Sequence, residues 1–274
     1  MSNPYFKFKE FIIYHDRCAM KVCTDACILG AWLAERIGGK KFLLDIGSGS
    51  GLLMMMLAQR SDSVIHGIEI DREAYAQSLE NIQQRNNPDG NDKYSAGNMF
   101  NNGRLQVFKG DVRSFSLPLK YDFIITNPPF YSNDLKAEKE EDNIAKHSSA
   151  LGLEALIDAI DHHLTNDGSF GLLLPVHRVN EFEKLAASRF RLKEKMLIRQ
   201  TPNHNHFRAI LYFERRNKNI PADAAELFPE DEQLKNFIPP LEAYTPMLYD
   251  LCIKDENGNY SRDFTVLLRD YYLK

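Results

Sequence analysis

The sequence has little of what marks membrane, secreted and fibrous proteins. Its 274 residues include 4 cysteines, and no apolar run approaches the roughly 20 residues that a membrane span needs. The stretch Met1–Glu10 lacks the apolar region of a secretory signal. No internal repeat or low-complexity tract is present. These absences predict a cytoplasmic protein without a membrane partner.

Metal ligands are equally sparse. Cys18, Cys23 and Cys27 have the spacing of neither a zinc ribbon nor a radical-enzyme cluster, and His204 and His206 lack cysteine or carboxylate ligands nearby. We therefore expect no metal, and small buried cysteines in a reducing compartment. The net charge of −4 argues against a protein that coats nucleic acid non-specifically, although a local basic face is compatible with it.

What is present is an ordinary globular composition, with 43% hydrophobic and 26% charged residues. Apolar runs that read as strands alternate with helical patterns, which predicts an α/β fold with a parallel sheet. The last two strands have no helix between them, which predicts an antiparallel edge. The expected strands are 41–46, 64–70, 105–108, 121–126, 169–174, 192–199 and 207–213, and the expected helices are 52–58, 71–85, 151–164 and 179–188. The fold class is thus a Rossmann-like, seven-stranded, mostly parallel sheet.

A glycine-rich loop follows the first of these strands. Gly47, Gly49 and Gly51 permit a sharp turn and close approach to a ligand, with a helix N-terminus behind them. Leu52 stands where a dinucleotide fingerprint has its third glycine. The preceding Asp45 would repel a pyrophosphate but attract the cationic amino-acid end of S-adenosylmethionine. The loop therefore predicts S-adenosylmethionine as the cofactor.

Three carboxylates follow the next strand ends. Glu69 is expected to accept from both ribose hydroxyls of the cofactor. Asp71 competes for that role, but it is also a natural N-cap of the helix after it. Asp111 is expected to accept from the adenine amino group, with a turn residue as the alternative interpretation.

The most specific signal is the tetrad Asn127-Pro128-Pro129-Phe130 at the end of a hydrophobic strand. The Asn127 side-chain oxygen and the Pro128 carbonyl are placed to accept both hydrogens of a planar amino group, which turns the nitrogen lone pair toward the methyl donor. Catalysis then needs positioning and oriented dipoles rather than a strong base. Phe130 offers a face on which a flipped base stacks. We expect Asn127 to contact the cofactor as well.

These motifs together resemble the class I amino methyltransferases. The ends of the chain narrow the resemblance to the bacterial family that N6-methylates the adenosine 3′ of the anticodon (position 37) in a valine tRNA. The stretches that carry the narrower resemblance are Phe8–Phe11, His15–Asp25, Leu29–Trp32 and Asn259–Leu273. The resemblance implies a tRNA substrate. It also implies that Lys21, Thr24 and Asp25 lie near the methionine end of the cofactor; Thr24 or Asp25 would in addition cap the helix through Trp32.

The chain is expected to form a single domain with three parts. Residues 1–35 would close the cofactor site, 36–216 would form the methyltransferase core, and 217–274 would be a C-terminal hairpin extension packed on it. Residues 86–103 and 131–149 are expected to be surface loops. Small basic clusters are candidates for RNA contact, with a solvated surface as the alternative for each. They comprise Lys7, Lys9, Arg17, His204, His206, Arg208, Arg215, Arg216 and Lys218.

Several functions stay open at this point. Relatives often carry Tyr where Phe130 stands, and Phe is also seen at this position in guanine-N2 methyltransferases. The tetrad serves DNA adenine and protein glutamine N5-methyltransferases too. From a different class, a non-catalytic RNA-binding protein with a retained cofactor pocket fits the same motifs.

Overall fold

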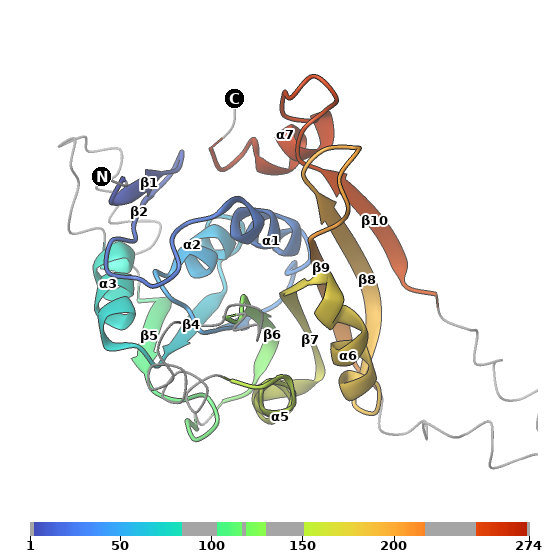
Figure 1. The fold of residues 1–274 in the computed structure, drawn as a ribbon. Coiled ribbons are helices and arrows are strands. Elements are labelled where there is room, and N and C mark those ends of the chain that lie inside the picture. The colour runs from blue at the N-terminus through green and yellow to red at the C-terminus, as the bar shows by residue number, and fades with distance from the viewer. Residues whose placement is uncertain (1–2, 84–102, 117–118, 130–150, 217–244, 273–274) are drawn as a thin grey trace, which may run out of the picture.

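The computed structural model describes residues 3–83, 103–116, 119–129, 151–216 and 245–272 (Figure 1). An eight-stranded sheet with the order β10-β8-β9-β7-β6-β3-β4-β5 forms its centre. Its strands are β3 (Phe42–Ile46), β4 (Val64–Glu69), β5 (Leu105–Lys109), β6 (Tyr121–Thr126), β7 (Leu164–Pro175), β8 (Phe190–Arg199), β9 (Arg208–Arg215) and β10 (Met247–Cys252). A separate antiparallel pair joins β1 (Tyr5–Lys7) and β2 (Ile12–Tyr14).

The strand directions confirm the predicted fold class and correct its details. Among the described strands of the large sheet, β9 alone runs antiparallel to its neighbours, β7 and β8. It lies inside the sheet rather than at its edge, because it turns back from β8 and inserts between β8 and β7. The sheet has eight strands instead of seven, since β10 pairs in parallel with the outer side of β8.

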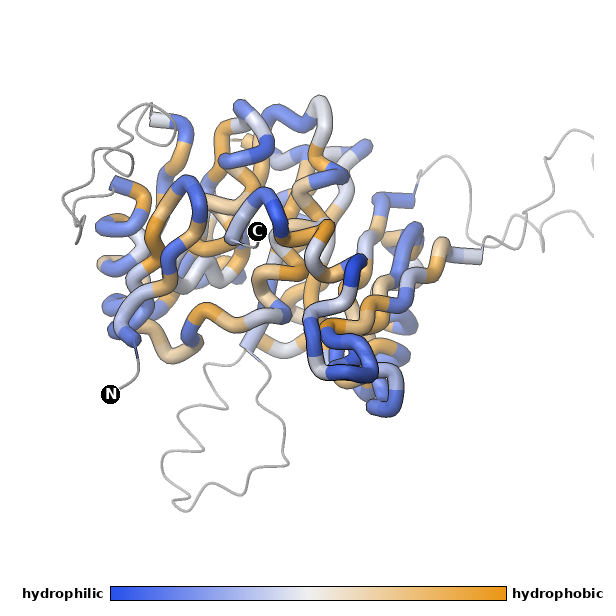
Figure 2. Tube along the Cα trace, turned by 90° about the horizontal axis from the view of Figure 1, so that it is seen from above, coloured by the Kyte–Doolittle hydropathy of each residue, from blue (hydrophilic) through white to orange (hydrophobic). Residues whose placement is uncertain are grey.

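Helices cover both faces of the sheet (Figure 1). One face carries α1 (Thr24–Ala34), α2 (Leu52–Ala58) and α3 (Arg72–Gln83), and the other carries α5 (Leu153–His163) and α6 (Val176–Ala186). Successive strand residues face opposite layers, so Leu43 belongs to the core under α1 and α2, and Leu44 to the core under α5 and α6. Hydrophobic segments accordingly gather in the interior, and hydrophilic segments lie toward the outside (Figure 2).

Segments from near the two ends of the chain meet over α1 and α2. The Lys9 amide donates to the Tyr271 carbonyl at 2.6 Å, and the rings of Phe6 and Tyr272 lie 5.1 Å apart. The Tyr271 hydroxyl donates to the Met56 carbonyl at 3.3 Å. The described part of the predicted C-terminal extension forms β10 and then α7 (Arg262–Leu268), whose N-cap is Ser261, and an antiparallel bridge pairs Lys254 with Tyr260 between them.

Two further expectations need correction. Neither Thr24 nor Asp25 is the N-cap of α1, because the helix already begins at Thr24 and Cys23 occupies the cap position without a side-chain hydrogen bond. Strand β7 begins at Leu164, directly after α5, and not at residue 169. The expected surface loops lie outside the described residues, apart from Gly103.

Candidate active site

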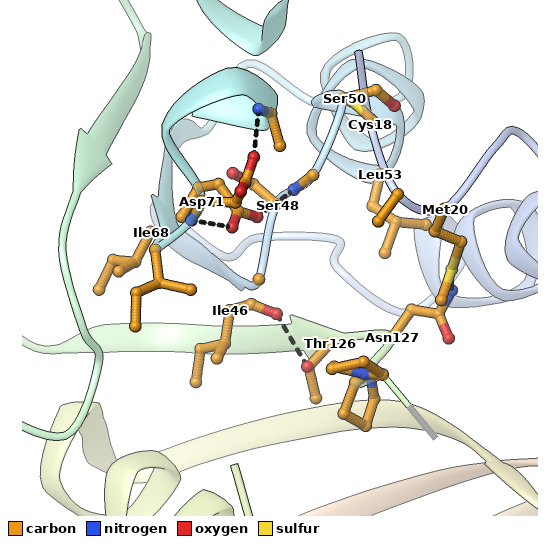
Figure 3. Close-up of a pocket in the computed structure, with 18 of the residues that line it drawn as sticks. Cys18, Met20, Ile46, Ser48, Ser50, Leu53, Ile68, Asp71, Thr126 and Asn127 are labelled. Atoms are coloured by element: carbon orange, nitrogen blue, oxygen red, sulfur yellow. Dashed lines mark hydrogen bonds between the residues drawn. The ribbon is translucent and has the colours of Figure 1, made fainter. Parts of the chain in front are cut away.

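A cavity of about 510 Å³ opens at the carboxyl ends of strands β3, β4, β5 and β6, the place where ligands bind in sheets of this plan. Its size is that of a small-molecule site. The glycine loop, the ends of β4 and β5, the first part of the tetrad and an N-terminal segment line it. Several of these lining residues are drawn in Figure 3.

The glycine loop passes over the end of β4 in a conformation that side chains disfavour. Gly47, Gly49 and Gly51 have φ values of 74°, 54° and 81°. The amides of Gly47 and Ser48 both donate to the Ile68 carbonyl, at 2.9 and 3.2 Å. Gly67 of β4 makes this approach possible, because a Cβ there would lie 2.9 Å from the Ser48 Cβ. An isolated glycine inside the 64–70 strand pattern is a sequence signal that could have indicated this close approach, although the prediction did not include it.

Glu69 ties the loop to the start of α3. Its Oε2 accepts from the Gly49 amide at 2.7 Å, and its Oε1 accepts from the Asp71 amide at 2.8 Å (Figure 3). Asp71 Oδ1 accepts in turn from the Ala74 amide at 2.8 Å, which confirms its predicted capping role. Both carboxylates line the cavity. Each Glu69 oxygen retains a second lone pair, so the carboxylate is both fixed and still able to accept from hydroxyls.

Asp111 lies on the same side of the cavity, beside Gly110 and Val112. The Arg113 Nε donates to both of its carboxylate oxygens at 2.9 Å. The hydrogen bonds from Arg113 lower the pKa of Asp111. The carboxylate therefore stays ionised as an acceptor over a wide pH range.

Asp45 is placed differently from the other carboxylates. It is fully buried and does not line the cavity, although its neighbours Ile46 and Gly47 do. Among the described residues, neither of its carboxylate oxygens has a hydrogen-bond partner, and the same holds for the Ser48 hydroxyl. Burial, and then the nearby charge of Glu69, raise the pKa of Asp45. Groups of this kind require a partner.

The side chains of Asp45 and Ser48, which lack hydrogen-bond partners among the described residues, bear on whether S-adenosylmethionine fits the site. The ammonium of its methionine end would offer a hydrogen bond to the Ser48 hydroxyl, which lines the cavity, and a positive charge near Asp45, which lies behind the glycine loop. The apolar side chains of Ile68, Ile70 and Val112 offer a surface for adenine, next to the Asp111 carboxylate. Since donors, acceptors and apolar surface are all of the right kind, the residues present fit this cofactor.

Asn127 lies at the opposite side of the cavity, just beyond β6. The Thr126 hydroxyl donates to the Ile46 carbonyl at 2.8 Å and so fixes the end of this strand. Asn127 Nδ2 donates to the sulfur of Met20 at 3.3 Å, while its Oδ1 is buried without a partner among the described residues. A thioether sulfur only accepts, so this contact sets which end of the amide turns toward Met20. Pro128 and Pro129 line the cavity, and Phe130 lies outside the described residues.

The segment of residues 15–22, here named the N-terminal wall, carries Met20 to this position (Figure 3). Lys21 Nζ donates to the carbonyls of His15 and Asp16 at 2.6 and 3.0 Å, and the Val22 amide donates to His15 Nδ1 at 3.1 Å. Hydrogen bonds within the segment thus stabilise the conformation of the N-terminal wall. Met20 escaped sequence analysis because its contact with Asn127 joins positions 107 residues apart.

The predicted cofactor residues fall into two groups. The cavity lining includes Lys21, Gly47, Gly49, Glu69, Asp111 and Asn127. It does not include Thr24, Asp25, Asp45 or Gly51. Asp25 is engaged elsewhere, because its Oδ2 accepts from Arg208 Nε at 3.0 Å.

The structure does not bring the RNA-contact candidates together. Arg215 is buried at the far end of β9, where its Nε donates to the Thr165 carbonyl at 2.9 Å, and Arg216 Nε donates to the Phe190 carbonyl at 3.2 Å. Lys7 and Lys9 lie near the β1–β2 pair, and Lys218 lies outside the described residues. Arg17 pairs with Glu80 of α3. The turn between β8 and β9 and the first residue of β9 hold the remaining candidates, at the same end of the sheet as the cavity. They are His204, His206 and Arg208.

The described residues contain neither a cluster of metal ligands nor a membrane-spanning helix. In the described part of the chain, no three histidine, cysteine or carboxylate residues gather as a metal site would require. None of the helices in the described ranges has the length and apolar character needed to cross a bilayer. The four cysteines are free thiols; Cys18 and Cys27 are buried.

Comparison with known proteins places these features in a family. The sequence pattern of the methyltransferase small domain matches residues 24–178. A Dyadobacter fermentans protein named tRNA1(Val) (adenine(37)-N6)-methyltransferase is 40% identical over 219 residues, 78% of this chain and 83% of that protein. A Pseudoalteromonas translucida protein of the same name is 32% identical over 271 residues, 98% of each chain. An Agrobacterium tumefaciens structure described as a predicted O-methyltransferase has a TM-score of 0.57 at 16% identity, over 90% of this chain and 97% of that one, which shows a shared fold.

Proposed function

The chain belongs to the methyltransferase small domain family, whose matching members include tRNA1(Val) (adenine(37)-N6)-methyltransferases, and from this premise we propose that it methylates N6 of adenosine 37 in a valine tRNA. It is an S-adenosylmethionine-dependent enzyme. The observation that carries the proposal is one cavity in which Asn127 faces a carboxylate-flanked glycine loop. Relatives of the stated name match along nearly the whole chain, including both ends.

Each side of the cavity has its own task in this reaction. When bound, S-adenosylmethionine supplies an electrophilic methyl group on a positively charged sulfur. Glu69 accepts from the ribose hydroxyls, Asp111 from the adenine amino group of the cofactor, and Lys21 and the glycine loop surround its methionine end. Asp45 compensates the ammonium from behind the loop, directly or through water.

Asn127 and Pro128 orient the target amine. The Asn127 Oδ1 and the Pro128 carbonyl accept the two hydrogens of the adenine amino group, which localises the nitrogen lone pair. Two successive prolines remove backbone donors from this stretch, so it presents acceptors to the amine. No side chain has to remove a proton before methyl transfer, because the amine becomes acidic only as its new bond forms. Catalysis then consists of positioning and preorganised dipoles. The target base reaches the cavity by flipping out of the anticodon loop, and Phe130 supplies the stacking face.

Two further assignments belong to this proposal. Residues 1–35 close the cofactor side of the cavity, 36–216 form the methyltransferase core and 217–274 extend it. A tRNA substrate also favours the cytoplasm as the site of action.

Nucleoside analysis of unmodified valine tRNA after incubation with enzyme and S-adenosylmethionine tests the proposal. We expect N6-methyladenosine that maps to position 37 and is absent when that adenosine is replaced by another base. Appearance of N2-methylguanosine instead would show that the target base has been misassigned. Methylation of protein but not RNA would favour glutamine as the target, and tight tRNA binding without transfer would favour a non-catalytic RNA-binding protein.

A further inference from the structure

A second hollow lies at the same end of the sheet as the cofactor cavity. The first turn of α6 and the turn that leads into β9 form its two sides. Its lining residues are Pro175, Val176, His177, Arg178, His206, Phe207 and Arg208. The two sides are joined by the sheet, because Pro175 pairs with Arg208 in register, and by a hydrogen bond from the Val176 amide to the Phe207 carbonyl at 3.4 Å.

The hollow is a close neighbour of Asn127. Strands β6 and β7 are adjacent and parallel, with Thr126 opposite Leu172. Pro175 therefore lies three residues beyond Leu172, the partner of the last residue of β6, and at the same end of the sheet as Asn127. On its other side, Arg208 is paired with Asp25 at the start of α1, immediately after the N-terminal wall. The hollow and the Asn127 side of the cavity therefore lie at the same end of the sheet, one strand apart.

The charges around the hollow are arranged asymmetrically. Arg178 and Arg208 line it together with two histidines, and no carboxylate does so. The carboxylates that pair with these side chains stand outside the lining. Glu181 accepts from Arg178 Nε at 2.6 Å and Nη2 at 3.1 Å, Asp25 accepts from Arg208 Nε at 3.0 Å, and Asp250 Oδ1 lies 3.2 Å from His206 Nε2. Each guanidinium has five N–H donors, so Arg178, two of whose donors are engaged by Glu181, keeps donors for another acceptor, and Arg208 adds its positive charge. The hollow therefore presents positive charge to an anion that binds between the first turn of α6 and the turn before β9.

An aromatic face accompanies these cations. Phe207 is 37% exposed, which is high for a phenylalanine, and the Arg208 guanidinium carbon lies 5.6 Å from the centre of its ring. Unpaired bases stack on such faces, and arginine reinforces the stack. Cations for a phosphate next to an aromatic ring for a base are the recognition elements of a single-stranded nucleotide.

We propose that this hollow binds the anticodon-loop nucleotide next to the target adenosine, with Arg178 and Arg208 on its phosphate and Phe207 against its base. The inference rests on the proposed tRNA substrate and assigns that substrate a second point of attachment. Flipping a base costs unstacking energy. A subsite for the neighbouring nucleotide offsets this cost and fixes the backbone while Asn127 receives the flipped base.

Direct binding of a valine tRNA transcript tests the subsite without requiring turnover. Arg178→Ala and Phe207→Ala are each expected to raise the dissociation constant for tRNA about 5–10-fold, as loss of one phosphate contact or one stacked base does. Arg178→Ala is also expected to reduce the slope of log affinity against log salt by about one, whereas Phe207→Ala leaves it unchanged. Affinity for S-adenosylmethionine should not change in either variant.

Matched controls separate a local effect from a general one. Arg189→Ala removes an arginine that is also paired with a carboxylate, Asp158, but lies beyond the opposite end of α6. Tyr260→Ala removes an aromatic side chain, 53% exposed, on the C-terminal segment. Both should bind tRNA as the wild type does. Phe207→Leu preserves apolar volume but lacks the ring, so it should behave as Phe207→Ala.

The outcomes are distinguishable. Wild-type tRNA affinity in folded Arg178→Ala, Phe207→Ala and Phe207→Leu variants would overturn the subsite while leaving the proposed function intact. This comparison measures binding alone, so its result does not depend on whether the wild type methylates position 37. Failure of the wild type to bind tRNA at all would overturn both the subsite and the tRNA substrate.

Discussion

The two sides of the cavity differ in how many of their polar groups are already occupied. On the cofactor side, Glu69 accepts from Gly49 and Asp71, and Asp111 accepts from Arg113. On the side of Asn127, a single contact with the Met20 sulfur orients the amide, and its oxygen has no partner among the described residues. The carboxylates on the cofactor side are therefore already held in position to bind the cofactor. The Asn127 side retains an acceptor for the reacting amine. Substitutions on the two sides should consequently affect different constants.

The largest effect is expected from Asn127→Ala. Removal of the acceptor that orients the amine should lower kcat by about 10²–10³-fold, comparable to loss of one preorganised polar contact in a transition state. Steady-state kinetics with valine tRNA measures kcat, and calorimetry measures S-adenosylmethionine affinity, which should change far less than kcat. Asn257→Ala, in an exposed turn, is the control. Full turnover by the Asn127 variant would refute the assigned role.

Glu69→Gln should reveal the opposite pattern. A glutamine amide has one acceptor oxygen where the carboxylate has two, so the dissociation constant for S-adenosylmethionine should rise about 10–100-fold through weakened charge-assisted hydrogen bonds. At saturating cofactor, kcat should stay close to the wild-type value. Glu73→Gln, an exposed carboxylate in the first turn of α3, should affect neither constant. A fall in kcat without a change in affinity would move Glu69 from the binding side to the reacting side.

Asp45→Asn combines a binding effect with a pH effect. The pKa of Asp45 is raised in the folded protein by burial, so its contribution to stability is present at low pH and is lost as the pH rises through the folded-state pKa. The variant without cofactor should therefore melt above the wild type at about pH 8, with the difference shrinking toward about pH 4. Scanning fluorimetry should also show that S-adenosylmethionine stabilises the variant less than the wild type. Equal stabilisation of both would exclude compensation of the ammonium by Asp45.

The smallest effect is expected at Met20. Met20→Leu keeps the apolar volume but removes the acceptor for Asn127 Nδ2, which should lower kcat about threefold, as loss of one weak hydrogen bond does. Met20→Gln restores an acceptor and should recover part of that loss, which a purely structural role would not predict. Met247→Leu, an exposed methionine of β10, serves as the control. A Met20→Leu enzyme with wild-type kcat would show that the amide of Asn127 is oriented without the sulfur.

The contrast between the two sides also explains how far the sequence predicts the structure. The glycine loop, Glu69, Asp71 and Asp111 are local signals at strand ends, and parallel strands bring their carboxyl ends together, so their convergence in one cavity could be predicted. The contact of Met20 with Asn127 depends on tertiary packing of the N-terminal wall, which no local pattern encodes. Strand β10 escaped prediction for a similar reason. Met247 and Leu248 are exposed, so the strand lacks the alternation that a half-buried strand displays.

The meeting of residues near both ends of the chain has a consequence for how the enzyme acquires activity after unfolding. Lys9 and Arg269, joined by a hydrogen bond, are 260 residues apart in sequence. Contacts of such separation form slowly, because the entropy of closing a long loop is lost before any interaction compensates it. The N-terminal wall begins only a few residues after Lys9, so its final position depends on one of the slowest contacts in the molecule. During refolding, helical content should thus return before the ability to bind S-adenosylmethionine.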